Sequence, residues 1–298
     1  MPELPEVETV RLGLNRVSLN QPVRGGEVRL ARSIAYPELA DNFLAGVVGT
    51  QVRCWHRRGK YLLGELQRPL PLEAIAHDIV EQPSGEVQAA GWLGVHLRMT
   101  GQLLWVDQAE AVQTHCRVRL FFDQGRELRY VDQRTFGRLW WVPPSEPLEG
   151  VMTGLQRLGP EPFAEDFSVA YLTAALKGRQ RPIKNALLDQ RLVAGIGNIY
   201  ADEALFMSGI RPKVVCDRLG KQRIARLRDA ILQVLTTSIE SGGTTFSDFR
   251  DVHGTNGNYG GVAWVYDREG EPCRVCGSKI ARLKLAGRSA HYCPQCQR

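Results

Sequence analysis

The sequence predicts an α+β protein with several domains, and three observations support this fold class. Apolar and polar residues alternate through much of the first half, which is typical of antiparallel strands. Helical periodicity replaces this pattern after about residue 158. Four of the seven cysteines fall within the last 26 residues, which indicates a small metal-stabilised module at the end of the chain.

Composition limits the classes of protein to consider. The chain has 298 residues, of which 43% are hydrophobic and 23% are charged, as expected for globular domains. Its apolar runs are far shorter than the ~18 residues of a spanning helix. The acidic N-terminus lacks the basic and apolar regions of a signal peptide. We therefore expect a soluble intracellular protein. The net charge of +6 suits a polyanionic partner without establishing one.

The first part of the chain contains several short segments with strand periodicity. They predict an antiparallel sandwich or barrel, with DQGR as one of its turns. The clearest segments are KYLLGEL at 60–66, VRLFF at 118–122, ELRYV at 127–131 and RLWWV at 138–142. The stretch from about Gln67 to Gly91 contains several prolines and few strand signals. We interpret it as an insertion or long surface loop; a partner site is the alternative.

The second part is predicted to be helical. LGPEPFAEDFS, from residue 158, has the composition of a linker followed by a helix start. Helical segments are expected at 169–178, 183–190, 199–209 and 223–242, and Gly242 is a candidate C-cap. The last helix carries an apolar face of Ile224, Leu227, Ile231, Leu232 and Leu235. A glycine-rich loop, DVHGTNGNYGGV, follows it.

The clustered cysteines form two C-x-x-C pairs separated by 16 residues, which is the spacing of a structural zinc ribbon. The predicted zinc ligands are Cys273, Cys276, Cys293 and Cys296. Disulfides are disfavoured inside cells, and a redox pair would not explain two motifs. Basic residues lie between the pairs, and they form either a solvated face or a hairpin that places cations on phosphate. They are Lys279, Arg282, Lys284 and Arg288.

A glycine turn, VAGIGNIYADEALF, lies between two predicted helices. Gly195, Gly197 and Asn198 precede a helix expected to begin at Ile199. Free N–H groups at such a helix start would bind a phosphate. A tight corner without a ligand fits the same residues, so the turn alone does not decide.

The opening segment, MPELPEVETV, supports two interpretations. Leu4, Val7 and Val10 continue to Leu14 as a helical stripe, with proline in the first turn. Alternatively, removal of Met1 exposes the secondary amine of Pro2, whose pKa as an α-amino group is about 8. Such an amine attacks electrophilic carbon and forms a Schiff base. Glu3 would then move protons, and Glu6, one turn further on, would tune both groups.

Taken together, the motifs resemble those of the formamidopyrimidine-DNA glycosylase family, bacterial-type enzymes that remove oxidised purines. The resemblance covers nearly the whole chain in order. The matching motifs are MPELPEVETV at 1–10, RRGKYLL at 57–63, HLRMTG at 96–101, DQRTFG at 132–137, LGPEP at 158–162, GIGNIYADEALF at 195–206, GGTT at 242–245 and AGR before the second cysteine pair.

The resemblance implies an N-terminal antiparallel β-sandwich, a C-terminal helix–two-turn–helix domain and a zinc-ribbon β-hairpin, with DNA in the cleft between them. The expected divisions are a catalytic domain at 1–157, a linker at 158–163, the helical domain with a lesion-capping loop at 164–261, and the zinc hairpin at 262–298. It further implies one structural Zn²⁺, no catalytic metal or organic cofactor, and double-stranded DNA containing oxidised bases as the partner. A monomer without membrane attachment, located in the cytoplasm or on the nucleoid, completes the expectation.

By the same resemblance, four residues carry the chemistry. Pro2 is the nucleophile on C1′ of the damaged nucleotide, and Glu3 is the proton donor. Lys60 serves β-elimination and contacts phosphate, while Arg288 binds a phosphate and assists δ-elimination. The predicted products are a one-nucleotide gap and phosphates at both of its ends.

The resemblance also implies the DNA contacts. Met99, Arg134 and Phe136 would fill the space that the extruded base leaves in the stack. The loop from about Asp248 to Gly261 would close over the extruded purine. Further contacts are expected from Glu6, His96, Gln113, His115, Arg179, Lys184 and Asn198. Gln113 departs from the family, which often has histidine there, and Arg179 stands where lysine is common.

Two rival functions remain. An endonuclease VIII-type glycosylase would prefer oxidised pyrimidines, but Leu4 and the long glycine-rich loop favour the purine enzyme. A non-catalytic damaged-DNA-binding homologue would keep the helical and zinc modules alone. The intact Pro2, Glu3 and Lys60 argue against it.

Overall fold

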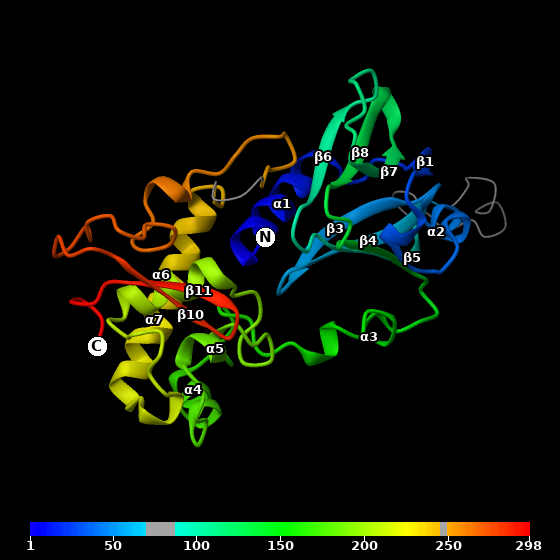
Figure 1. The fold of residues 1–298 in the computed structure, drawn as a ribbon. Helices are drawn as coiled ribbons and strands as arrows, with labels where there is room; N and C mark the ends of the chain where they lie inside the picture. Colours follow the sequence, from blue (N-terminus) through cyan, green and yellow to red (C-terminus); the bar gives the residue numbers. More distant parts are fainter. Residues whose placement is uncertain (70–86, 245–248) are drawn as a thin grey trace, which may run out of the picture.

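A computed structural model of the chain describes residues 1–69, 87–244 and 249–298. Figure 1 shows a strand-rich N-terminal half beside a helical C-terminal half, with the N-terminus between them. Within the described ranges, no helix is long and apolar enough to cross a membrane.

Two sheets form the N-terminal half, as the strand pattern predicted. The strand orders are β2-β9-β5-β4-β3 and β1-β7-β8-β6, and only the short pair of β2 with β9 is parallel among the described pairs. The strands are β1 Gly25–Val28, β2 Ile34–Tyr36, β3 Gln51–Arg58, β4 Tyr61–Pro69, β5 Val87–His96, β6 Gly101–Asp107, β7 Cys116–Phe121, β8 Arg126–Asp132 and β9 Arg138–Val142.

Alternate residues of these strands meet in one apolar core between the sheets. Val95 and Leu139 of the first sheet and Leu103 and Leu128 of the second are all buried there. The stripe on helix α1, Leu4–Val17, is buried as expected, and its Val7, Val10 and Leu14 join this core. Helix α1 thereby lies between the sheets and the helical half of the molecule (Figure 1).

The interpretation of residues 67–91 as a loop is wrong at both ends. Gln67 pairs with Ala89, and Pro69 pairs with Val87, so these residues extend strands β4 and β5. Arg68, Pro69 and Val87–Ala89 are exposed whichever face of the sheet they lie on, so they lack the alternation of a half-buried strand. Residues 70–86, the rest of this stretch, lie outside the described residues.

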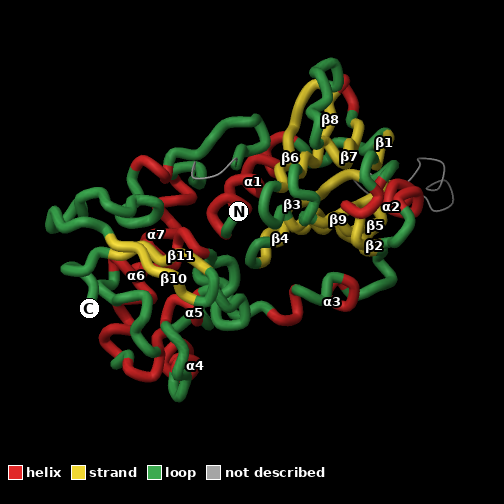
Figure 2. The backbone as a smooth tube through the Cα atoms, in the orientation of Figure 1, coloured by secondary structure: helices red, strands yellow, loops and turns green. Residues whose placement is uncertain are grey.

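Helices dominate the C-terminal half, as Figure 2 shows in red. The helices at 169–178, 183–190, 199–209 and 223–242 are confirmed with shifts of a few residues at their ends. Gly242 follows the last helix with φ +73°, a left-handed conformation that suits glycine at a helix end. The α-helices after α1 are α2 Ala40–Val47, α3 Leu148–Val151, α4 Val169–Leu176, α5 Ile183–Leu187, α6 Asn198–Met207 and α7 Lys221–Glu240.

A two-stranded hairpin, β10 Ala281–Leu285 and β11 Arg288–Tyr292, lies against helix α6. Phe206 of α6 packs with Val265 and Ile280 in a small core beside the clustered cysteines. Among the described residues, the short 3₁₀ helices are Ala31–Ser33, Asp123–Gly125, Leu155–Arg157, Cys216–Arg218 and Tyr259–Gly261.

Candidate active site and metal centre

The N-terminus lies where two pockets adjoin. One pocket, of about 420 Å³, is lined by residues that include Met1, Lys60 and Arg288. The other, of about 400 Å³, is lined by residues that include Met1, Glu3 and Arg288. Pro2 is buried, and Met1, to which it is bonded, belongs to both pocket walls. The structure therefore brings all four predicted catalytic residues together, although they lie far apart in sequence.

The Glu3 carboxylate occupies the N-terminus of helix α6. Its oxygens accept hydrogen bonds from the N–H groups of Ile199 at 3.0 Å and Tyr200 at 3.4 Å. The amide of Leu4 donates to the Gly195 carbonyl at 3.0 Å. The helix start thus holds a carboxylate of the same chain. A phosphate at this turn would therefore not receive the N–H groups of Ile199 and Tyr200, and the backbone contact expected from Asn198 stays a prediction.

The two glycines of this turn permit the close approach. Gly195 has φ +90°, and a Cβ there would lie 2.7 Å from Leu4. A Cβ at Gly197 would lie 2.3 Å from the carboxylate carbon of Glu3. Both glycines are therefore required by the passage of the N-terminal segment.

Glu6 accepts hydrogen bonds from both halves of the molecule. Its carboxylate accepts from the amide of Glu3 at 2.8 Å, the hydroxyl of Tyr200 at 2.5 Å and the amide of Thr244 at 3.0 Å. Burial, with the neighbouring Glu3, raises the pKa of Glu6 to about 7. The Tyr200 hydroxyl also lies 2.5 Å from Ser238 on helix α7. Sequence reasoning missed Tyr200, although it stands within the GNIYADE motif.

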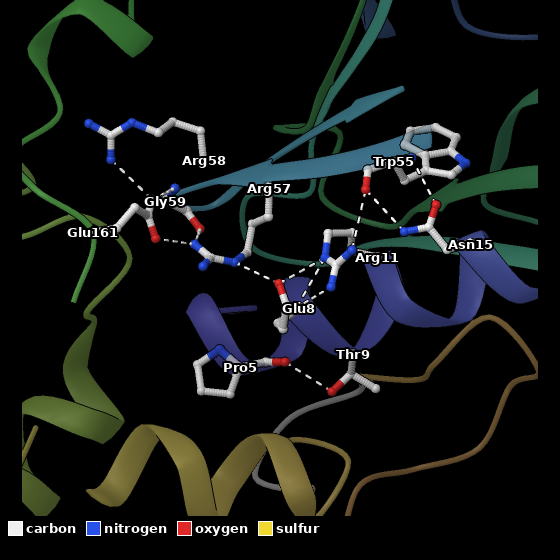
Figure 3. Close-up of polar contacts among 10 residues, drawn as sticks. All are labelled: Pro5, Glu8, Thr9, Arg11, Asn15, Trp55, Arg57, Arg58, Gly59 and Glu161. Carbon is white, nitrogen blue, oxygen red and sulfur yellow. Dashed lines mark hydrogen bonds and ion pairs between the residues drawn. The ribbon is translucent and has the colours of Figure 1, made fainter. Parts of the chain in front are cut away.

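Lys60 follows a turn that the linker holds in place (Figure 3). Glu161 of the LGPEP motif accepts from the amide of Gly59 at 2.6 Å and from Arg57 at 2.6 Å. Arg57 also binds Glu8 of helix α1 at 2.9 Å. Burial lowers the pKa of Lys60 below its ordinary value. The roles of Glu8 and Glu161 were not predicted from the sequence, because their partners lie elsewhere in the chain. Both residues do stand within motifs of the family resemblance, and that was the only sequence signal for them.

His96 lies in the wall of the first pocket as a neutral ring. Burial, with Arg98 and Lys60 nearby, lowers the pKa of His96 to about 3. Its Nδ1 accepts from the Arg98 amide at 3.0 Å, which assigns the proton to Nε2. His96 can therefore donate a hydrogen bond there without carrying a charge.

The three residues expected to enter the base stack lie on two neighbouring loops. Arg134 is exposed, Phe136 is 52% exposed, and Met99 is half-buried in the wall of the second pocket. The guanidinium carbon of Arg134 lies 5.0 Å from the centre of the Phe136 ring. Asn198 lines the same pocket as Met99 and carries a buried Oδ1 with no hydrogen-bond partner among the described atoms.

Other predicted DNA contacts are engaged within the protein. Lys184 is fully buried, pairs with Asp202 at 2.7 Å and donates to the carbonyl of Ser289. This geometry connects helix α5 to helix α6 and to the hairpin strand that carries Arg288. Asp202 and Ser289 therefore hold the ammonium group of Lys184 within the protein, and its contact with the DNA backbone stays a prediction.

The departure at Gln113 has a structural explanation. Its Oε1 accepts from Arg129 at 3.1 Å, and Arg129 is a fully buried cation paired with Glu127. His115 lies 3.1 Å from the guanidinium of Arg117, and so its ring is also held within the loop. Arg179 is half-buried in the connection after helix α4. Gln113, His115 and Arg179 do not line either pocket at the N-terminus.

The four clustered cysteines form a metal centre. Their sulfur atoms all lie within 4.8 Å of one another, with 3.9 Å between Cys273 and Cys296 and 3.4 Å between Cys276 and Cys293. A tetrahedron of Zn–S bonds of about 2.3 Å has edges of about 3.8 Å, so the arrangement fits Zn²⁺. Four thiolate ligands leave no open position, and the zinc is structural.

Comparison with protein families accounts for most of the chain. The matching family models are "Formamidopyrimidine-DNA glycosylase N-terminal domain" at residues 1–139, "Formamidopyrimidine-DNA glycosylase H2TH domain" at 158–250 and "Zinc finger found in FPG and IleRS" at 270–298. This chain belongs to the formamidopyrimidine-DNA glycosylase family.

Individual relatives support the same assignment. The formamidopyrimidine-DNA glycosylase of Acaryochloris marina is 60% identical over 297 residues, which cover 100% of this chain and 99% of the relative. The solved MutM (Fpg) protein of Thermus thermophilus is 36% identical, with a TM-score of 0.81 over 99% of this chain and 98% of that one. A mutant of the Lactococcus lactis Fpg, solved in complex with a Fapy-dG containing DNA, is 30% identical, with a TM-score of 0.84 over 100% of both chains.

Proposed function

We propose that this protein is a DNA repair glycosylase and AP lyase. It excises oxidised purines, such as 8-oxoguanine and formamidopyrimidines, from duplex DNA and then cleaves the strand by β- and δ-elimination. The observation that carries the proposal is the position of Pro2 and Glu3, which are buried where the pocket lined by Lys60 adjoins the pocket lined by Glu3, with Arg288 in the walls of both. The solved Lactococcus lactis relative holds a Fapy-dG lesion in DNA, which supports this substrate class.

The chemistry begins with loss of Met1, which frees the Pro2 amine. The amine attacks C1′ of the damaged nucleotide, the bond from C1′ to the base breaks, and the base leaves with a proton. Glu3 is the proton carrier, because its carboxylate is fixed beside the nucleophile by helix α6. The resulting aminal opens to a Schiff base, whose positive charge acidifies the protons on C2′. Loss of one of these protons expels the 3′ phosphate, and a second elimination expels the 5′ phosphate.

Lys60 and Arg288 support the elimination steps. Lys60 has a pKa lowered by burial, which increases the fraction of neutral amine available to take a proton. Arg288 is exposed on the zinc hairpin, where it would bind the departing phosphate. Asn198, whose side chain lines the second pocket, would bind the backbone beside the lesion.

Met99, Arg134 and Phe136, which we call the wedge residues, would enter the base stack and hold it open. The loop from about Asp248 to Gly261 would cover the extruded purine. Its first residue, Asp248, lies outside the described residues. We propose domain limits of 1–157, 158–163, 164–261 and 262–298, and the three matched family segments support this division. A monomer acting on chromosomal DNA completes the proposal.

The decisive experiment compares substrates on one protein preparation whose N-terminus is shown by mass spectrometry to be Pro2. Borohydride is expected to trap the protein on duplex DNA with 8-oxoguanine opposite cytosine. Excision of 8-oxoguanine should exceed excision of thymine glycol; the reverse order would indicate an enzyme for oxidised pyrimidines. Pro2→Gly should bind the lesion yet excise it slowly, and equal rates would place the nucleophile elsewhere. Absence of any trapped adduct would leave a non-catalytic DNA-binding protein.

A further inference from the structure

The two loops that carry the wedge residues have ends fixed by the sheets. His96 of β5 pairs with Arg138 of β9 in one sheet, and Gly101 of β6 pairs with Asp132 of β8 in the other. Residues 97–100 and 133–137 therefore cross between the sheets side by side. Strand register places Met99 next to the pair Arg134 and Phe136, although it does not fix how the loops themselves fold.

One buried carboxylate lies between these loops. Asp132 is 1% exposed, and its Oδ1 accepts from the hydroxyl of Thr100 at 2.5 Å. Its Oδ2 accepts from the amide of Gly137 at 2.8 Å and from the hydroxyl of Tyr130 at 3.1 Å. The carboxylate thus binds the residue after Met99 and the residue after Phe136.

The Thr100 hydroxyl completes the connection. While it donates to Asp132, it accepts from the amide of Arg134 at 3.0 Å. Arg134 is therefore fixed through its own backbone amide. Phe136 is fixed through the amide of Gly137, and Met99 is fixed through the side chain of Thr100. The chain of contacts runs from one loop to the other through a single hydroxyl and a single carboxylate.

Backbone geometry shows that these contacts hold a demanding conformation. Thr135 has φ +57°, an uncommon value for a β-branched residue. A Cβ at Gly137 would lie 1.7 Å from the Tyr130 hydroxyl, so glycine is required where the loop passes Asp132. Uncommon backbone conformations persist where surrounding contacts determine them, and Asp132 supplies several of these contacts.

We propose that Asp132 is a positioning residue for base extrusion, acting with Thr100. It holds both loops in the conformation that enters the DNA before DNA is bound, so that the wedge residues need little ordering when the base leaves the stack. The inference rests on the proposed function, and it assigns to the Asp of the DQRTFG motif a task in extrusion rather than in bond breaking. Asp132 is the last residue of strand β8, where it supports the two loops, and it lines neither pocket at the N-terminus.

Asp132→Asn tests the proposal, because an amide cannot accept from Thr100, Tyr130 and Gly137 together. In single-turnover assays, excision of 8-oxoguanine from paired duplex should slow by about 100-fold, as for other misplacements of about 1 Å. Cleavage of an abasic site in single-stranded DNA has no stack to open, and should keep the parent rate. Fluorescence of 2-aminopurine beside the lesion, which reports unstacking, should rise more slowly in the variant.

Three comparisons keep the test sharp. Asp123→Asn, an exposed aspartate at the opposite end of β8, should match the parent on both substrates. Thr100→Val should reproduce the selective loss, and Thr100→Ser should restore the parent rate; this pair decides the matter if Asp132→Asn does not fold. Equal loss on both substrates, or no loss on either, would overturn the proposal. Failure of the parent protein on both substrates would instead refute the proposed function.

Discussion

Gly197→Ala tests the position of Glu3 directly. The added Cβ would lie 2.3 Å from the Glu3 carboxylate carbon and 2.4 Å from Oε1. Carbon atoms in contact lie about 3.5–4.0 Å apart, so the carboxylate must retreat by about 1 Å. The bonds from Ile199 at 3.0 Å and Tyr200 at 3.4 Å would then exceed hydrogen-bond length. The alanine at position 197 therefore displaces the Glu3 carboxylate, while Glu3 itself remains a glutamate.

The expected effect falls on the rate of base excision. A misplacement of about 1 Å at a catalytic group costs on the order of 100-fold in rate, or about 2.7 kcal/mol of activation free energy. The backbone itself is not strained, because Gly197 has φ −131°, which alanine adopts. Loss of two charge-assisted bonds should lower the free energy of unfolding by about 1–3 kcal/mol.

The assay is single-turnover release of 8-oxoguanine from duplex DNA, with borohydride trapping and thermal unfolding measured alongside. Gly220→Ala is the matched control, since Gly220 is the N-cap of helix α7 and a Cβ there meets no atom within 4 Å. It should keep the parent rate. If Gly197→Ala kept the parent excision rate, or if both variants lost the same fraction of it, the position of Glu3 set by this turn would not determine the rate.

Four further predictions concern other parts of the molecule. Because the pKa of Glu6 is raised to about 7, the folded protein keeps a proton that the unfolded chain has released, and its stability should fall by about 3 kcal/mol as pH rises from about 4.5 to 7. Glu6→Gln should flatten this dependence in thermal melts; an unchanged slope would assign the titration to another group. Elemental analysis should find one zinc per chain, absent in Cys273→Ser and retained in Cys54→Ser; zinc in both would exclude the four-cysteine site. Lys184→Met should lower the free energy of unfolding by about 3–5 kcal/mol, as for a broken buried ion pair. Arg288→Ala should leave the free energy of unfolding unchanged and reduce the salt dependence of DNA binding by about one ion. If Arg288→Ala instead lowered stability and Lys184→Met reduced the salt dependence, Lys184 would be the DNA contact and Arg288 the structural residue.

Local patterns in the sequence predicted the parts of the fold that local physics controls. Helix α1 and strand β7 each bury one face, and burial of one face gives the sequence a recognisable period. The zinc site was predictable because Cys273 and Cys276 must aim two thiolates at one metal, which fixes their spacing. The ends of β4 and β5 could not be predicted, because both faces are exposed there.

The roles of several site residues depend on partners that are distant in sequence. A glycine turn before a helix has the same local pattern whether it binds phosphate or Glu3, and Glu3 lies almost 200 residues away from Ile199. The buried ion pair of Lys184 likewise depends on Asp202, a partner outside the local pattern around Lys184. Asp132 could be read only as a strand end, since its three donors come from two loops and a neighbouring strand position.

The first turn of helix α1 connects the two halves of the molecule, in addition to the chemistry proposed for it. The hydrogen bonds described for this segment begin at the amide of Glu3, and they continue through Leu4 to Gly195 and through Glu6 to Thr244. Met1 lies outside this set and lines both pockets. Removal of Met1 should therefore leave the junction of the two halves intact while it opens the pockets and frees the amine of Pro2. In the proposed mechanism, processing of the N-terminus would thus control the chemistry without being required for the fold.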